Sequence, residues 1–154
     1  MKTYKALLPE ITLKYKTGEH VKAKVSSSQD AADILIKTFN QDMIEAQEEF
    51  IAIFLNRASN TIGWMRVSTG GLSATVVDPK LIFSTALKCL ASGVILAHNH
   101  PSGEIKPSAA DIAMTKKIVQ GGSLLDITII DHLIVALDSD KKGIYYSFAD
   151  EGQL

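Results

Sequence analysis

Two histidines and an aspartate lie close together in the sequence at a spacing that suits metal binding. His98 and His100 follow a compact apolar run, residues 94–97, that predicts a short buried strand. Because residues two apart along a strand point the same way, both imidazoles would lie on one face and Asn99 on the other. A Pro-Ser-Gly segment ends the strand, and Asp111 falls in the first turn of a predicted helix. Two imidazoles and one carboxylate can therefore meet just past the strand, as a ligand set for zinc with one position left for water.

Structural interpretations of the same residues compete with this one. A single histidine more often completes a structural hydrogen bond than binds a metal, and the i, i+2 pair makes the two interpretations about equal. Ser108 and Asp111 also match the Ser-x-x-Asp pattern of a capping box, in which the serine hydroxyl accepts from a backbone N–H. We favour capping for Ser108, whereas ligation and capping are equally supported for Asp111.

The complete pattern is His-x-His, seven residues, Ser, two residues and Asp, and it resembles the JAMM metal-binding motif of the JAB/MPN metalloprotease superfamily. The matching positions are His98, His100, Ser108 and Asp111. Two further features resemble the RadC-like branch in particular. They are the string Ile-Leu-Ala-His-Asn-His-Pro-Ser-Gly from residue 95, and Asp131-His132 before an apolar strand. The resemblance covers about residues 44–148. It implies one Zn²⁺ per chain, held by His98, His100 and Asp111, and hydrolysis of a peptide or isopeptide amide.

Amide hydrolysis also needs a base that takes a proton from water and passes it to the leaving amine. Glu48 and Glu49 precede an apolar strand, where two adjacent glutamates are by themselves expected to be solvated. The RadC-like resemblance implies a glutamate two residues before an aromatic, which Phe50 supplies, so Glu48 is the match. Glu49 is the second choice, and strand alternation sends it to the opposite face. As a hypothesis from the same resemblance, Ser108 donates a hydrogen bond to the oxyanion of the intermediate.

Three further residues have side chains that could do chemistry: Asp131, His132 and Cys89. Asp131-His132 lies at the predicted join between two strands, where it could be a ligand or support one from behind. A structural hydrogen bond at this join is the favoured interpretation. Cys89 is the only cysteine, which excludes an internal disulfide and a cysteine-only zinc site. We expect it to be a buried, inert thiol in a helix.

Composition limits the classes of protein. The 154 residues are 46% hydrophobic and 21% charged, which suits one globular domain with a sizeable core. The net charge is −1 without a basic run, which argues against strong sequence-independent nucleic-acid binding and leaves only a local basic patch open. No apolar run approaches membrane-spanning length, and the N-terminus lacks the long apolar region of a signal peptide. We therefore expect a cytoplasmic protein with no membrane attachment.

Hydrophobic patterning predicts strands interleaved with helices, and hence an α/β fold (an α+β sandwich) with a mixed β-sheet flanked by helices. The resemblance implies the same fold, JAB/MPN-like with cytidine-deaminase-like layering. The predicted strands are residues 50–55, 61–67, 94–97, 127–130, 133–137 and 144–148. The predicted helices begin after Ser27, at Asp78-Pro79 with Ile82, Leu87 and Leu90 buried, and at residue 109, the last ending at Gly121-Gly122. We expect residues 1–43 to form an N-terminal extension, with a hairpin over 11–25 and a helix, packed on a RadC-like JAB/MPN domain of residues 44–154.

Two functions fit these observations. The first is a zinc metallopeptidase of JAMM type acting on an unidentified peptide or protein. The alternative is a non-catalytic binding module of the same fold, associated with DNA repair or mobile-element processing. DNA association is weakly supported, because no Gly-rich helix-hairpin-helix segment like that of many family members is present. Lys80-Leu81 also stands where the family carries Arg-Glu, so any support that this pair gives to a partner surface or to the surroundings of the metal is missing. A nuclease is disfavoured because such sites use paired metals and more carboxylates. Apolar hairpins could pair two copies, so a homodimer stays open.

Overall fold

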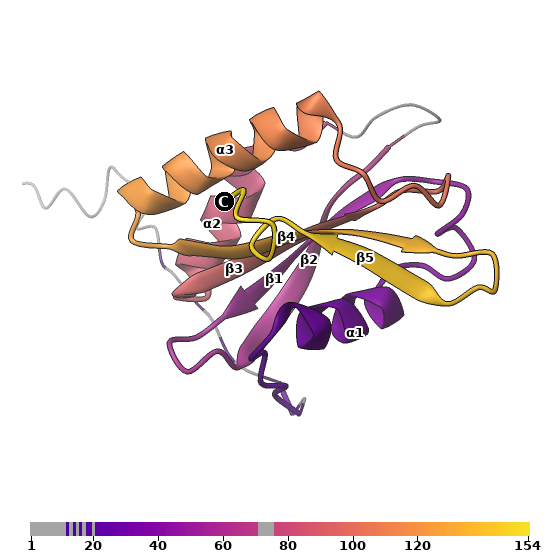
Figure 1. Cartoon of the computed structure of the whole chain (residues 1–154). Coiled ribbons are helices and arrows are strands. Elements are labelled where there is room, and N and C mark those ends of the chain that lie inside the picture. The colour runs from indigo at the N-terminus through magenta and orange to yellow at the C-terminus, as the bar shows by residue number, and fades with distance from the viewer. Residues whose placement is uncertain (1–11, 13, 15, 17, 20, 71–75) are drawn as a thin grey trace, which may run out of the picture.

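A computed structural model describes residues 21–70 and 76–154, together with residues 12, 14, 16, 18 and 19. A five-stranded sheet with the order β2-β1-β3-β4-β5 forms the centre of this part of the chain (Figure 1). The strands are β1 (Glu49–Leu55), β2 (Thr61–Thr69), β3 (Gly93–Asn99), β4 (Thr128–Leu137) and β5 (Gly143–Ser147). β3 and β4 run parallel and the other neighbours antiparallel, which confirms the predicted mixed sheet.

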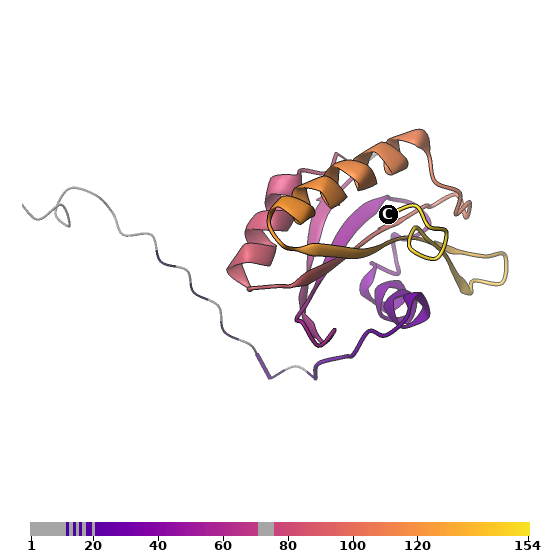
Figure 2. The same ribbon diagram turned by 60° about the vertical axis from the view of Figure 1, so that its left-hand side comes forward.

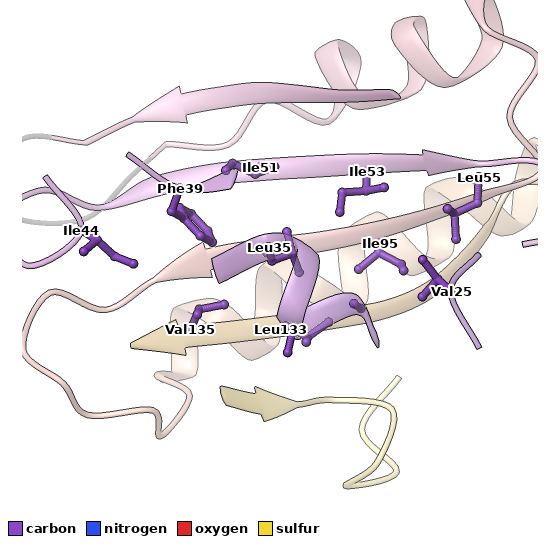
Figure 3. Packing of buried hydrophobic residues seen from close by; sticks show 13 residues of the cluster. Val25, Leu35, Phe39, Ile44, Ile51, Ile53, Leu55, Ile95, Leu133 and Val135 are labelled. Carbon is purple, nitrogen blue, oxygen red and sulfur yellow. The ribbon is translucent and has the colours of Figure 1, made fainter. Parts of the chain in front are cut away.

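Helices cover both faces of the sheet, as the layers in Figure 2 show. The α1 helix (Ser28–Thr38) lies on one face, and α2 (Pro79–Lys88) and α3 (Ala109–Leu124) lie on the other. Because side chains alternate along a strand, Ile51 and Ile53 of β1 pack under α1 (Figure 3), whereas Phe50 packs with α2 and α3. The sheet therefore separates two apolar clusters, and the predicted α/β class is confirmed.

The starts of the first two helices follow the sequence signals. The Ser27 hydroxyl accepts a hydrogen bond from the Asp30 N–H at 3.1 Å, and the Asp78 carboxylate accepts one from the Lys80 N–H at 3.0 Å. Pro79 is the first residue of α2, where its missing N–H is not needed. Residues 11, 13, 15, 17 and 20 of the predicted hairpin over 11–25 lie outside the described residues, and none of its described residues belongs to a strand of the sheet. Of its described part, Lys24 forms an isolated antiparallel bridge with Asn60.

Two expectations about α2 and α3, the helices on the face opposite α1, are wrong. Ile82 is buried as predicted, but Leu87 and Leu90 are 47% and 74% exposed, because α2 ends at Lys88 and buries Ile82 and Ala86. The α3 helix does not end at the glycines but continues through both to Leu124. A Cβ at Gly121 would lie 2.8 Å from the Phe83 ring, and one at Gly122 would lie 2.4 Å from a backbone oxygen. These glycines therefore permit close packing and do not stop the helix.

The predicted break at Asp131-His132 is also wrong, because β4 is one continuous strand. The pairing of β4 with β3 shifts by one residue, so that Val94 pairs with Ile129 and Ile95 with Asp131. Ile130 is the extra residue of this bulge, and it directly precedes the polar pair Asp131-His132 that interrupts the apolar pattern. The Asp131 carboxylate accepts hydrogen bonds from the His132 N–H, the Ala149 N–H and the Ser147 hydroxyl at 2.7, 3.0 and 2.6 Å. A polar residue is thus accommodated inside the strand.

In the part of the chain that the structure describes, no helix has the length and apolar character needed to cross a membrane.

Candidate metal centre

The three predicted ligands come together where β3 ends and α3 begins. His98 lies in β3 opposite Phe50 of β1 and is 1% exposed, and His100 follows directly after the strand. The Nε2 atoms of the two histidines are 3.0 Å apart. Asp111 Oδ1 lies 3.2 Å from His98 Nε2, and Asp111 Oδ2 lies 3.7 Å from His100 Nε2. Among the described residues, this is the group of titratable side chains whose ligand atoms lie near enough together to hold one ion.

Hydrogen bonds orient the two outer ligands. His100 Nδ1 lies 2.7 Å from the Glu104 carbonyl oxygen, which can only accept, so in the neutral ring Nδ1 carries the proton and Nε2 carries the lone pair. The N–H and the hydroxyl of Ser108 both donate to Asp111 Oδ2, at 2.7 and 2.6 Å. The Asp111 N–H in turn donates to the Ser108 oxygen at 3.1 Å. The predicted capping box is therefore present, and it holds one carboxylate oxygen while the other faces His98.

The charges of these groups favour a cation. Burial raises the pKa of Asp111, but the contacts with His100 and His98 outweigh it and hold that pKa well below its ordinary value. The hydrogen bond with Asp111 raises the pKa of His100, against the opposing effect of burial. Asp111 is therefore a carboxylate at neutral pH, and a proton on His100 Nε2 competes with a metal ion for the same atom.

The geometry fits a zinc ion. Ligand atoms at the usual 2.0–2.1 Å from a tetrahedral zinc lie about 3.3 Å from one another. The two imidazole nitrogens are 3.0 Å apart and Asp111 Oδ1 lies 3.2 Å from His98 Nε2, both near this value. One ligand atom from each of the three residues lies within 4.8 Å of the others. Two imidazole nitrogens and one carboxylate oxygen are also donors that zinc prefers, and three protein ligands leave a fourth position open. The donor set and its spacing therefore match a catalytic type of zinc site.

His132 supports this cluster from behind. It is completely buried, and its Nε2 lies 2.8 Å from His98 Nδ1. Its Nδ1 lies 2.6 Å from the hydroxyl of Thr115 in α3. Its ring stacks on Phe148, with centroids 4.8 Å apart. Burial, followed by the charge of His98, lowers the pKa of His132 well below its ordinary value, so the ring is neutral.

The two glutamates separate as strand alternation predicts. Glu48, just before β1, lines a pocket of about 430 Å³ together with His100, Ser108 and Asp111. Glu49 is buried, and its carboxylate lies 3.2 Å from Arg66 Nε of the neighbouring strand. The catalytic roles of Glu48 and Ser108 stay predictions, but both residues line the pocket of the candidate ligands.

Sequence reasoning missed the buried Thr115, and it placed Asn99 on the opposite face from the imidazoles without giving it a supporting role. Thr115 follows Asp111 by four residues, a spacing that places both on one helix face and could have drawn attention to it. Asn99 Oδ1 accepts from the Glu49 N–H at 2.7 Å, and its Nδ2 donates to the Gln47 carbonyl at 2.9 Å. Asn99 therefore forms hydrogen bonds with the backbone on both sides of Glu48, at Gln47 and Glu49. Cys89 caps the end of α2 and is only partly buried, and burial raises the pKa of its thiol.

The mixed sheet has one helix on one face and two on the other, and the His-x-His segment at the end of β3 faces an aspartate at the start of α3. This combination defines a domain of the JAB/MPN class. The family model of the RadC-like JAB domain matches residues 25–153, and the chain belongs to this family.

Its relatives come from bacteria and archaea. A UPF0758 protein of Flavobacterium johnsoniae is 44% identical over 84% of this chain and 53% of the relative. One from Methanosarcina mazei is 37% identical over 87% of this chain and 55% of the relative, and one from Thermotoga maritima is 31% identical over 96% and 67%. The chain thus spans about half the length of the first of these relatives.

Proposed function

We propose that this chain is a zinc-dependent hydrolase of JAMM type that cleaves a peptide or isopeptide amide. The observation that carries the proposal is the meeting of His98, His100 and Asp111 at zinc-like distances beside a pocket lined by Glu48. A zinc ion bound there would lower the pKa of water from about 15.7 toward about 7 and polarise the substrate carbonyl.

The protein groups around the pocket supply the remaining steps. Glu48 accepts a proton from the attacking water and passes it to the leaving amine. The protonated amine can no longer attack the carbonyl carbon. Ser108 donates its hydroxyl proton to Asp111 Oδ2 in this structure, at 2.6 Å. Its hydroxyl therefore has to rotate away from Asp111 before it can donate to the oxyanion of the substrate.

The pocket combines titratable groups with an apolar wall, which suits a peptide whose side chain lies next to the scissile amide. Phe50, Val77, Pro79 and Met114 form an apolar wall beside the titratable groups, and Lys117 lies at the helical turn beyond Met114. An extended peptide can place its scissile carbonyl at the ligands while an adjacent side chain contacts this wall.

The decisive comparison is between Glu48→Gln and Glu49→Gln. Both remove one carboxylate, but only Glu48 lines the pocket, whereas Glu49 is paired with Arg66. We expect Glu48→Gln to retain zinc and to lose about 10²–10⁴-fold in the cleavage rate of a fluorogenic peptide or isopeptide library. Glu49→Gln should cleave at nearly the wild-type rate. A Glu48→Gln protein that hydrolyses as fast as wild type would remove Glu48 from the mechanism, and a zinc-loaded wild type without hydrolysis would favour a binding module.

A further inference from the structure

A chain of buried hydrogen bonds leads from one candidate ligand to another through residues that have no part in the motif. It starts at His98 Nδ1, passes through His132 and the hydroxyl of Thr115, and ends at the Asp111 backbone carbonyl. The three links measure 2.8, 2.6 and 2.6 Å. His98, His132 and Thr115 are each at least 99% buried, so water does not compete for their protons.

The direction of every proton follows from the last link. A carbonyl oxygen can only accept, so a 2.6 Å contact between it and the Thr115 oxygen requires the single hydroxyl proton to lie between them. Thr115 has then no proton left for His132, and its oxygen must accept from His132 Nδ1. His132 is buried between phenylalanine rings, where the charged form is disfavoured, so its Nε2 carries a lone pair. This lone pair must accept from His98 Nδ1.

From this order we propose that His132 and Thr115 are positioning residues that fix the tautomer of His98. They keep a proton on His98 Nδ1 and thereby leave Nε2, the atom 3.2 Å from Asp111 Oδ1, free to bind a metal ion. The inference rests on the proposed metal site. It adds to it that the ligand His98 is prepared from behind by α3, the same helix that carries Asp111.

Thr115→Val tests this order, because valine keeps the size of threonine and removes only the hydroxyl. His132 Nδ1–H then loses its acceptor, so the ring no longer has a preferred tautomer and the proton on His98 can move to Nε2. We expect the zinc dissociation constant, measured by competition with a chromophoric chelator, to rise about 10–100-fold. Thr115→Ser keeps the hydroxyl and is the matched control, with a dissociation constant near that of wild type.

A second measurement reads the tautomer directly and needs no variant. In metal-free wild type at about pH 8, two-bond ¹H–¹⁵N spectra of the imidazoles should place the His98 and His132 protons on Nδ1. A His98 proton on Nε2, or a Thr115→Val dissociation constant within about twofold of that of Thr115→Ser, would overturn the proposal. Neither readout needs a substrate. A wild type that binds no zinc would refute the proposed function while the spectra still decide the tautomer, and a zinc-binding protein without hydrolysis leaves the positioning role intact.

Discussion

Zinc affinity should fall steeply as the pH is lowered, and His100 should be the main reason. A histidine binds zinc only through a deprotonated nitrogen, so zinc and a proton compete for Nε2. The hydrogen bond with Asp111 raises the pKa of His100, and the bond to the Glu104 carbonyl adds to this effect. The proton therefore competes at a higher pH than it would in an isolated histidine.

The expected slope follows from which ligands release protons. The pKa of Asp111 is held far below its ordinary value, so this carboxylate is already deprotonated and releases none above about pH 5. At a pH below its raised pKa, His100 is protonated and releases one proton when zinc binds. Each pH unit in that range should therefore raise the zinc dissociation constant about tenfold, which corresponds to about 1.4 kcal/mol.

The stability of the metal-free protein should show the opposite trend for the same residue. Since the folded pKa of His100 is raised, its interaction with Asp111 contributes stability that is fully present below the unfolded pKa and is lost as the pH rises through the folded pKa. The increase in melting temperature caused by zinc should accordingly grow with pH, because the metal-free state loses an interaction while zinc binds more tightly.

Chelator-competition titrations between about pH 5.5 and 8, with calorimetry in buffers of different ionisation enthalpy, measure the slope and count the released protons. Glu49→Gln is the control, because its side chain is paired with Arg66, away from the ligands, and its curve should overlay that of wild type. A dissociation constant that does not change with pH, or zinc binding without proton release below the ordinary histidine pKa, would refute the reasoning.

Three further predictions concern metal retention and the scaffold. Elemental analysis should find one zinc in wild type and none in His98→Ala, because the remaining pair of ligands cannot close the site. Gly122→Ala would place a methyl group 2.4 Å from a backbone oxygen and should cost roughly 1–3 kcal/mol in urea unfolding, whereas Gly63→Ala, with no atom within 4 Å, should be much milder. Asn99→Ala leaves buried backbone groups unpaired, so it should cost about 1–3 kcal/mol and lower the cleavage rate more than zinc affinity, since Glu48 loses its support. Equal stability of the two alanine-for-glycine variants, or an unchanged cleavage rate in Asn99→Ala, would contradict these expectations.

The ligands could be predicted from the sequence because their relation is local. The two imidazoles are two positions apart at the end of one strand, and a capping pattern sets Asp111 at the start of the next helix. Each relation depends on backbone geometry that adjacent residues determine. The separation of Glu48 from Glu49 follows equally from strand alternation.

The supporting residues could not be found in this way, because their contacts join segments far apart in the chain. His132 reaches His98 only after β4 has paired parallel to β3, and Asn99 reaches residues 44–49 only across the β1–β3 pairing. The length of α3 was mispredicted for a related reason. The space requirement at Gly121 is set by Phe83 of α2, a residue that no local pattern connects to it.

The bulge at Ile130 links the register of the sheet to the candidate metal centre. Ile129 faces the cluster under α2 and α3, and strict alternation would send Leu133 to that face and His132 to the other. The extra residue reverses the phase, so Leu133 packs under α1 and His132 reaches Thr115 of α3. A strand of the same sequence that alternated strictly from Ile129 onward would therefore direct the His132 imidazole into the apolar cluster under α1 and Leu133 toward His98. The bulge at Ile130 is thus the feature that gives His98 its hydrogen-bond partner His132.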